Sequence, residues 1–171
     1  MEQWFIGDLH FFDRNIIKFE NRPFKEVKEM NSTLVNSWNT LIKNEDIVYL
    51  LGDVANENAD KVLLQKLIKS LNGKIILIAG NHDKNNLDFY KKECGLEVYN
   101  YPIIIDDFWI LSHEPMYVSQ QSPYANIFAH VHNNPLYTTV STRSYCVSAE
   151  RISYKPINFK TIKQRILKME E

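Results

Sequence analysis

The sequence is poor in the residues that mark several protein classes. Its 171 residues include 5 glycines and 6 prolines, too few for a fibrous or low-complexity disordered chain. It has only two cysteines, Cys94 and Cys146, and no C-x-x-C pair, so we expect reduced, partly buried thiols. No apolar run approaches the roughly 18 residues of a membrane span, and the first residues do not resemble a signal peptide. We therefore expect a cytoplasmic protein with no membrane partner.

The sequence also lacks an excess of charge of either sign. Its 20 basic and 21 acidic residues leave a net charge of -1, whereas nucleic-acid-binding domains usually show a strongly basic footprint. The net charge thus does not indicate a nucleic-acid partner, although it does not exclude a local basic groove. The length corresponds to roughly one domain of about 100–200 residues, and we predict a single domain over residues 1–171.

Short apolar runs alternate with helical patterns in the first half of the chain. The predicted strands are residues 3–6, 46–51 and 74–79. A helix is predicted over residues 25–43, and a second is marked by Leu64, Leu67, Ile68 and Leu71, with Gly73 expected as its C′ residue. This alternation favours an α/β sheet with parallel neighbours.

The second half is richer in short strands. These are predicted at residues 96–101, 103–105, 108–112, 127–129 and 145–148, with a tight turn at Asp106-Asp107. A last helix follows, with Asn158 as its N-cap and an apolar face made of Phe159, Ile162, Ile166 and Met169. We expect an α/β fold with helices outside.

Polar clusters follow five of the predicted strands. They are Asp8-Leu9-His10, Gly52-Asp53, Gly80-Asn81-His82-Asp83, Ser112-His113 and His130-Val131-His132. Because ligands of open α/β sheets bind outside the carboxyl ends of the strands, we expect one convergent site. Each cluster alone is more often structural, as a turn, a helix cap or a surface strand. Their common order behind apolar strands favours a functional site.

The spacing within the clusters predicts metal binding. On an extended backbone, residues two apart point the same way, so Asp8 and His10 would reach one point, as would His130 and His132. Imidazole and carboxylate suit divalent metals such as manganese, iron, cobalt, nickel and zinc. Because there are more candidate ligands than one tetrahedral metal needs, two metals sharing a carboxylate are the economical arrangement.

With these motifs in order, the sequence resembles the calcineurin-like metallophosphoesterases, whose signature is D-x-H, G-D, G-N-H-[DE], H and G-H-x-H. The resemblance runs from residue 6 to 132, and the segment from Phe11 to Trp38 resembles a small bacterial and phage branch. Ala129 departs from the glycine usual before the last motif, which would narrow the strand end slightly. Asp13 stands where a basic or imidazole side chain is expected, which weakens any substrate contact there.

The resemblance implies a fold, a metal centre and a role for each residue. The fold would be an α/β/β/α sandwich of two packed mixed sheets flanked by helices. One metal would be held by Asp8, His10, Asp53 and His132, and the other by Asp53, Asn81, His113 and His130. His82 would face the scissile phosphate as a general acid or charge stabiliser, and Asp83 would orient an imidazole or cap a helix. Manganese is favoured, with iron, zinc, nickel or cobalt as alternatives.

The implied reaction is hydrolysis of a phosphoester by a hydroxide shared between the metals. A phosphodiester is slightly preferred as substrate, and a nucleotide is one candidate. A nuclease or RNA-processing enzyme, a protein phosphatase and a non-catalytic scaffold remain alternatives, and oligomeric state is open.

Substrate contacts are less well marked in the sequence. Arg22 and Arg143 are candidate phosphate contacts, against the alternative of solvated surface arginines. Residues 114–126 and 133–144 are expected as loops flanking an open site. Tyr117, Tyr124 and Tyr137 on these loops could stack on an aromatic group or pack under the loops. The basic run Lys160, Lys163, Arg165 and Lys168 is expected on the solvated face of the last helix.

Overall fold

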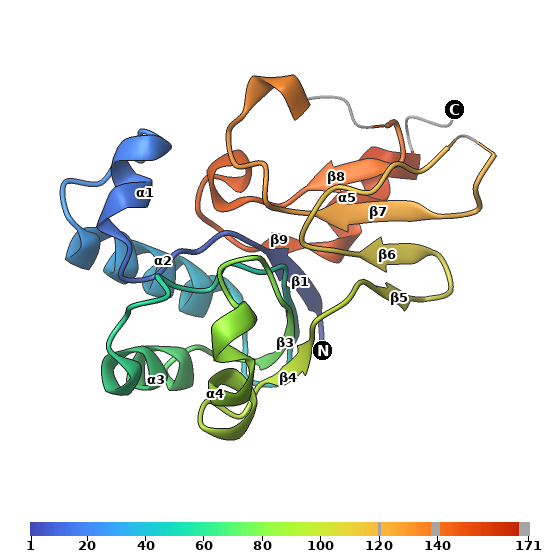
Figure 1. Ribbon diagram of the computed structural model, residues 1–171. Helices are drawn as coiled ribbons and strands as arrows, with labels where there is room; N and C mark the ends of the chain where they lie inside the picture. The colour runs from blue at the N-terminus through green and yellow to red at the C-terminus, as the bar shows by residue number, and fades with distance from the viewer. Residues whose placement is uncertain (120, 138–140, 168–171) are drawn as a thin grey trace.

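The computed structural model describes residues 1–119, 121–137 and 141–167, and within them the chain folds into two β-sheets with helices around them (Figure 1). The first sheet has the strand order β4-β3-β2-β1-β9. Its strands are β1 (Gln3–Ile6), β2 (Ile47–Leu50), β3 (Lys74–Ile78), β4 (Glu97–Tyr99) and β9 (Ile157–Asn158). All neighbours are parallel except β9, which pairs antiparallel with β1. The carboxyl ends of β1 to β4 therefore meet at one edge.

The second sheet has the order β5-β6-β7-β8. Its strands are β5 (Ile103–Ile105), β6 (Trp109–Leu111), β7 (Ala125–Phe128) and β8 (Ser144–Cys146). Strands β6, β7 and β8 are parallel, and β5 joins β6 through a hairpin. Asp106 and Asp107 form its turn with φ values of 51° and 53°, the left-handed conformation that a type I′ turn requires. The predicted tight turn is confirmed.

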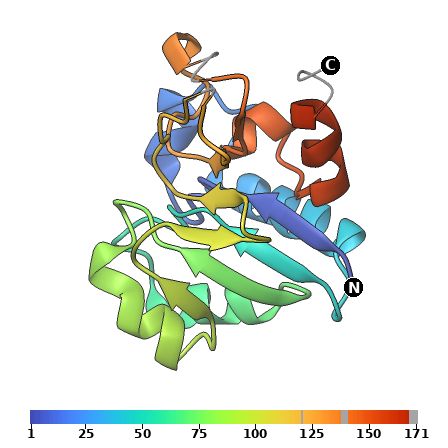
Figure 2. The same cartoon turned by 90° about the vertical axis from the view of Figure 1, so that its right-hand side faces the viewer.

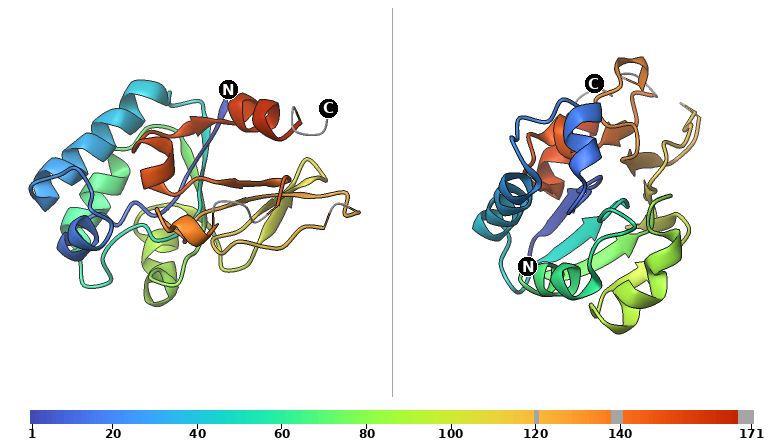
Figure 3. Two further views of the ribbon diagram at one scale, coloured as in Figure 1. Left: turned by 90° about the horizontal axis from the view of Figure 1, so that it is seen from above. Right: turned by 60° about the vertical axis from the view of Figure 1, so that its left-hand side comes forward.

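Two helices cover the outer face of the first sheet. They are α2 (Val27–Leu41) and α3 (Lys61–Lys69), and Figure 3 shows them on the side away from the second sheet. Met30, Leu34 and Trp38 recur at helical spacing and are at most 2% exposed. They pack in one core with alternate residues of β3, Ile75 and Leu77. The other helices on this half are the six-residue α1 (Arg14–Phe19) and α4 (Leu87–Lys92).

A second core lies between the sheets. The other alternate residues of β3, Ile76 and Ile78, pack there with Leu111 of β6 and Ile127 of β7. Helix α5 (Phe159–Leu167) adds its apolar face, Phe159, Ile162 and Ile166, and lies beside β1 (Figure 2). Asn158 Oδ1 accepts a hydrogen bond from Lys160 N, as expected of an N-cap. Three short 3₁₀ segments complete the described structure, Lys84–Asn86, Pro135–Tyr137 and Ala149–Ile152.

Gly7, directly after β1, connects the two sheets at the edge where the parallel strands end. Its N–H donates to Val147 O at 2.9 Å, and its carbonyl accepts from Ala149 N at 3.1 Å. A Cβ on Gly7 would lie 2.4 Å from Ala129 Cβ, so the bare glycine leaves the space that the Ala129 methyl group fills. The alanine at position 129 is thus accommodated by its neighbour in the other sheet.

The predicted fold class, two packed mixed sheets flanked by helices, is confirmed. All eight predicted strands occur, with ends displaced by at most two residues, and the three predicted helices are α2, α3 and α5. The C′ position predicted for Gly73 is wrong, because α3 ends at Lys69 with Ser70 as C-cap. Gly73, with φ of 88°, instead turns the chain into β3. Helices α1 and α4 and strand β9 were not predicted, and Met169 lies outside the described residues.

Candidate metal centre

The predicted site residues gather at the edge where the parallel strands of both sheets end. Asp8 and His10 follow β1, Asp53 follows β2, Asn81 and His82 follow β3, His113 follows β6, and His130 and His132 follow β7. Because the two sheets place their strand ends at the same edge, loops far apart in the sequence contribute to one site.

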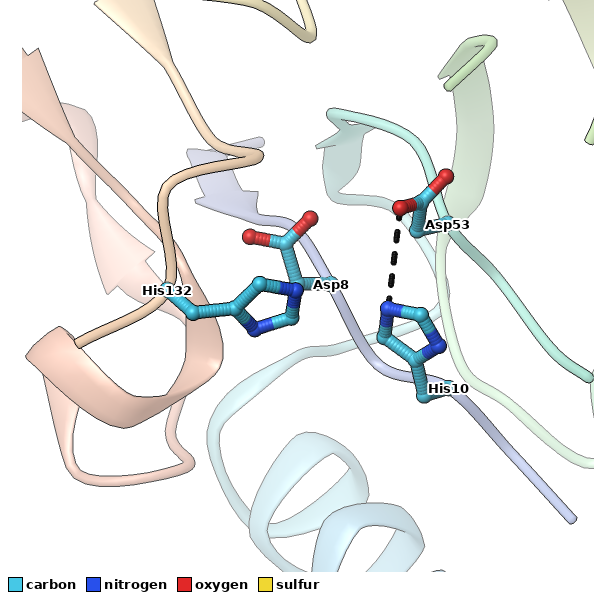
Figure 4. Close-up of side chains that lie close together, drawn as sticks. All are labelled: Asp8, His10, Asp53 and His132. Atoms are coloured by element: carbon cyan, nitrogen blue, oxygen red, sulfur yellow. Dashed lines mark ion pairs between the residues drawn. The ribbon is translucent and has the colours of Figure 1, made fainter. Parts of the chain in front are cut away.

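A first group of possible metal ligands consists of Asp8, His10, Asp53 and His132. One ligand atom from each lies within 4.8 Å of those of the others. Figure 4 shows the four side chains around a common space, with the His10–Asp53 ion pair marked. The first three are buried and His132 is partly buried. Two carboxylates and two imidazoles form a donor set suited to a borderline divalent metal.

A second group consists of Asp53, His113 and His130, whose ligand atoms also lie within 4.8 Å of one another. His113 Nε2 is 3.0 Å from His130 Nδ1 and 3.0 Å from Asn81 Oδ1. Three potential ligand atoms of different residues thus point at one small volume. The predicted second ligand set of Asp53, Asn81, His113 and His130 is brought together as a unit.

Asp53 belongs to both groups. Its Oδ2 atom is 3.6 Å from His10 Nε2 and 3.4 Å from His113 Nε2. Its Oδ1 atom accepts a hydrogen bond from the main-chain N–H of His82 at 3.0 Å. The carboxylate is therefore held from one side while its other oxygen faces both groups.

Buried polar atoms without hydrogen-bond partners indicate that these residues fit a metal ion. Asp8 Oδ1 and both ring nitrogens of His10 are buried without a hydrogen-bond partner in the described structure. Buried polar atoms are normally hydrogen-bonded, since leaving them unpaired costs roughly 1–3 kcal/mol each. A divalent cation would satisfy Asp8 Oδ1 and His10 Nε2, which faces Asp53, whereas His10 Nδ1 faces Asp13 on the other side of the ring. Asp8, His10, Asp53, Asn81, His113, His130 and His132 therefore remain our predicted metal ligands.

Burial and opposite charges compete in the metal-free site: burial raises the pKa of Asp8 and lowers that of His130, whereas neighbouring opposite charges prevail at His10, His113 and Asp53. Burial by itself would lower the pKa of His10, but the carboxylates of Asp13 and Asp53 outweigh it and raise the pKa to about 9. His113 behaves in the same way, with Asp53 and Asp8 raising its pKa to about 9 against the effect of burial. Conversely, burial would raise the pKa of Asp53, but these two histidines hold it far below its usual range. In the metal-free site, His10 and His113 are therefore protonated at neutral pH, and a bound metal would displace these protons.

The backbone at the ligands differs from our expectation. Residues Asp8, His10, Asp53, His130 and His132 have φ values between 46° and 69°, so they are left-handed and not extended. The argument that residues two apart on a strand point the same way is wrong here. Asp8 and His10 do share a group, but His130 and His132 fall in different groups. Left-handed residues bend the loops sharply, and the bends aim these side chains.

Arg22, which we predicted to contact substrate, has its donors taken up by protein atoms. Its side chain is fully buried beneath the ligands and is paired with Glu150, from Nη2 to Oε1 at 2.6 Å. It also donates to the carbonyl oxygens of Asp8 at 2.7 Å and Leu9 at 2.9 Å. All its donor nitrogens are directed at protein atoms, so Arg22 supports the ligand loop after β1.

Glu150 was missed by the sequence argument. Its Oε1 atom is 3.1 Å from His132 Nδ1. The other ring nitrogen of His132, Nε2, is therefore the one left to bind a metal. Burial would raise the pKa of Glu150, but His132 and Arg22 lower it to about 2. The signal for it was present, since Glu150 follows β8 as the other site residues follow their strands.

Asp83 neither orients an imidazole nor caps a helix through its side chain, so both predicted roles are wrong. Its buried carboxylate accepts hydrogen bonds from the N–H groups of Gly80, Asp53 and Val54 at 2.7–3.1 Å. It thereby ties the loop after β3 to the loop after β2. Asp13 does face an imidazole, since its Oδ2 atom is 3.5 Å from His10 Nδ1.

Among the described residues, two adjoining pockets with Glu114 and Pro115 in both linings open beside the candidate centre. One of about 340 Å³ opens beside Asn81 and His113, and we call it the Tyr101 pocket; Lys84, Tyr101, Pro102 and Met116 are among its other walls. The second, the His132 pocket, has about 430 Å³ and is lined by residues that include Glu20, Glu114, His130, His132 and Tyr137. Of the three tyrosines predicted near the site, only Tyr137 lines either pocket.

Other predicted contacts lie elsewhere. Arg143 donates to Ser122 O at the amino ends of β7 and β8, opposite the centre, so the prediction that it contacts phosphate is wrong. Lys160 pairs with Glu2, Lys163 pairs with Asp106, and Arg165 donates to Tyr145 Oη. Residues 120, 138–140 and Lys168 lie outside the described part.

Cys94 and Cys146 are free thiols. No described helix is both long and apolar enough to cross a membrane.

The fold and this donor set define a metal-dependent phosphoester hydrolase in general terms. The profile of the calcineurin-like phosphoesterases matches residues 1–167, and the chain belongs to this family. The family resemblance inferred from the motifs is thereby confirmed.

Similar proteins come from Methanocaldococcus jannaschii, Mycobacterium phage L5 and Aquifex aeolicus. An uncharacterized protein of Methanocaldococcus jannaschii is 36% identical over 96% of this chain and 91% of its own length. The Gene 66 protein of Mycobacterium phage L5 is 32% identical over 47% of this chain and 39% of its own. The crystal structure of a protein of unknown function from Aquifex aeolicus aligns with a TM-score of 0.77 at 27% identity, covering 95% of this chain and 98% of the other.

Proposed function

We propose that this protein is a phosphodiesterase that uses two divalent metal ions, with manganese the preferred metal. One observation carries the proposal: Asp53 Oδ2 lies 3.6 Å from His10 Nε2 and 3.4 Å from His113 Nε2, between two groups of ligands. A carboxylate shared in this way suits a pair of metals about 3.5–4 Å apart, as in many phosphoryl-transfer enzymes. Iron, zinc, nickel and cobalt suit the same mixture of nitrogen and oxygen ligands.

Metals bound there would polarise the phosphate oxygens and lower the pKa of an attacking water toward neutrality. The chain itself supplies positioning and a proton. The exposed ring of His82 lies beside that of His10, with centroids 5.2 Å apart, so it can face a phosphate at the ligands. Its main-chain N–H is held by Asp53. We assign to the His82 ring N–H the transfer of a proton to the leaving oxygen.

The two pockets support a diester over a monoester. A phosphodiester carries two organic groups, and the candidate centre has one pocket beside Asn81 and His113 and another beside His130 and His132. Each group would therefore have its own place. A monoester would use one pocket only.

Metal-dependent hydrolysis of two chromogenic esters tests the proposal. The protein is stripped with a chelator and assayed with bis-p-nitrophenyl phosphate and p-nitrophenyl phosphate, before and after addition of Mn²⁺. We expect turnover only with metal and a higher kcat/KM for the diester. Hydrolysis of the monoester alone would indicate a phosphatase, and no hydrolysis with two metals bound would favour the scaffold alternative.

Replacement of His82 tests its assigned role. We expect His82→Ala to lower kcat by roughly 10²–10⁴-fold, the usual contribution of a general acid, while metal content stays unchanged. Plasma mass spectrometry of the dialysed protein gives the metal content. Asn85→Ala, an exposed position in the 3₁₀ segment that follows His82, is the matched control and should retain wild-type kcat. Full activity of His82→Ala would refute the assignment.

The nuclease alternative receives less support from the charges near the site. Glu20 and Glu114 line the His132 pocket, where a continuing strand would place further phosphates. Like charges repel, so a polynucleotide would be disfavoured there. Steep loss of activity with added salt would be the sign of a nucleic-acid substrate.

A further inference from the structure

We propose that the Tyr101 pocket binds a planar aromatic group of the substrate, of the nucleobase type. The inference deepens the proposed phosphodiesterase function and rests on it for the identity of the site. The pocket opens directly from the candidate centre, since Asn81 and His113 belong both to its lining and to the second ligand group. A group esterified to a phosphate at that centre would reach the pocket without crossing open solvent.

The walls of the pocket suit an aromatic ring. Tyr101 is 59% exposed and Met116 is 38% exposed, so both offer apolar surface that nothing in the described protein covers fully. The Tyr101 ring contacts Tyr99 edge-on, with centroids 5.9 Å apart and planes at 74°. This contact restrains the ring and leaves it available as a stacking platform. Aromatic side chains stack on bases of every kind, and thioethers also contact ring edges favourably.

The rim of the pocket suits a ring with polar edges. Lys84 and Asn100 are exposed members of the lining, and Lys84 forms no ion pair with any residue that the structure describes. Both can donate hydrogen bonds to ring nitrogens or exocyclic oxygens. An alkyl chain would use the apolar walls alone, and a bare sugar would leave Tyr101 and Met116 uncovered.

The volume of the Tyr101 pocket and the charge of the His132 pocket limit the size and charge of the substrate's two organic groups. A volume of about 340 Å³ is near the lower end of the roughly 300–1,000 Å³ typical of small-molecule pockets, which suits a single nucleoside-sized group. Glu114 lies between the two pockets and lines both, and the adjoining His132 pocket also contains Glu20, so that pocket would favour an uncharged or cationic second group. The inferred substrate is a small diester with one aromatic side.

The inference is tested with two ligands, one of which carries an adenine ring that the other lacks. Binding of adenosine 5′-monophosphate and of ribose 5-phosphate to the Mn²⁺-loaded protein is measured by calorimetry, with phosphate release monitored. We expect adenosine 5′-monophosphate to bind at least about tenfold more tightly, within the roughly 5- to 150-fold range of one stacked base. Tyr101→Ala should abolish this preference and change the affinity for ribose 5-phosphate by less than about twofold. Tyr101→Phe should retain the preference.

Tyr137→Ala is the matched control, because Tyr137 is a partly exposed tyrosine of the His132 pocket. It should leave the preference intact. Equal affinity of the two ligands for the wild-type protein, or an equal loss of both in Tyr101→Ala, would overturn the inference. Because the readout is binding, the result is separate from that of the diester assay. Metal-dependent diester turnover without a preference for the adenine-containing ligand would refute only the proposal for the Tyr101 pocket. A preference for that ligand without diester turnover would refute only the proposed phosphodiesterase function.

Discussion

Arg22 and Glu150 form a buried ion pair directly beneath the candidate ligands. The Arg22 side chain is fully buried, and that of Glu150 is 3% exposed. The pair joins the carbonyl of Asp8 to the ring of His132, because Arg22 donates to the former and Glu150 contacts the latter. Side chains in such outer positions fix the orientation of metal ligands and usually affect metal affinity 10- to 100-fold.

Glu150→Gln should therefore weaken the fold and the metal site together. It removes the charge opposite Arg22, and an unpaired buried charge typically costs about 3–5 kcal/mol. We also expect metal affinity to fall by roughly 10- to 100-fold. Chemical denaturation and a competitive metal titration measure the two effects.

A double variant separates the two effects. Arg22→Met with Glu150→Gln removes both charges, and we expect part of the lost stability to return. Metal affinity should stay low, because His132 still lacks its carboxylate partner. If Glu150→Gln alone bound metal as tightly as the wild type, the support role of Glu150 would be wrong.

The chemistry of the site could be predicted from the sequence, but its supporting residues could not. Asp, Asn and His carry their ligand character wherever they stand, so their order behind strands was informative. The role of Arg22 depends on Glu150, which lies 128 positions away. An arginine in a polar segment gives no local sign that the fold will bury it. Its prediction as a phosphate contact failed for this reason.

At the scale of elements, the ends of β1 and β7 fit each other through one methyl group. A Cβ on Gly7 would lie 2.4 Å from Ala129 Cβ and 2.8 Å from Leu51 O. We expect Gly7→Ala to destabilise the protein by about 2 kcal/mol or more through overpacking. Ala129→Gly should cost about 1 kcal/mol through lost burial and a freer backbone.

The double exchange checks whether the two positions act as a pair. Gly7→Ala combined with Ala129→Gly should regain about 1 kcal/mol relative to Gly7→Ala, because the space vacated at position 129 receives the new methyl group. Recovery should be incomplete, since Leu51 O stays close. Strictly additive free energies of unfolding in urea would contradict this account.

The elements that could be predicted are those with a strong local pattern. Strands such as β3 (Lys74–Ile78) are β-branched apolar runs, and α2 repeats its apolar residues over 15 positions. Helices α1 and α4 have six residues each, fewer than two turns, so no periodicity can develop. Strand β9 has two residues and exists because it pairs with β1, which is a tertiary condition.

At the scale of the whole molecule, metal binding should be coupled to pH. In the metal-free protein His10 and His113 have pKa values raised to about 9, so both are protonated at pH 7. Since metal ligands must be deprotonated, binding at pH 7 should release about two protons from these imidazoles, and affinity should rise up to about pH 9. Calorimetry in buffers of different ionisation enthalpy counts the protons, and zero release would contradict the charge arrangement.

The same shifts affect stability in a defined direction. A raised pKa in the folded state means that the protonated histidines stabilise the metal-free fold fully below about pH 6.5. This contribution should be lost as the pH rises through about 9. The metal-loaded protein should lack this loss and show a higher Tm throughout, because bound metal favours the folded state.

The left-handed backbone at five candidate ligands carries a consequence for how such a chain can evolve. Asp8, His10, Asp53, His130 and His132 all have positive φ, a conformation that costs non-glycine residues on the order of 1–2 kcal/mol each, though Asp and His tolerate it better than most. Glycine at any of these positions would relax the chain and remove a ligand. Mutations selected for thermal robustness and mutations that preserve chemistry are therefore opposed at the same five positions, so the most durable variants of this fold should be inactive ones.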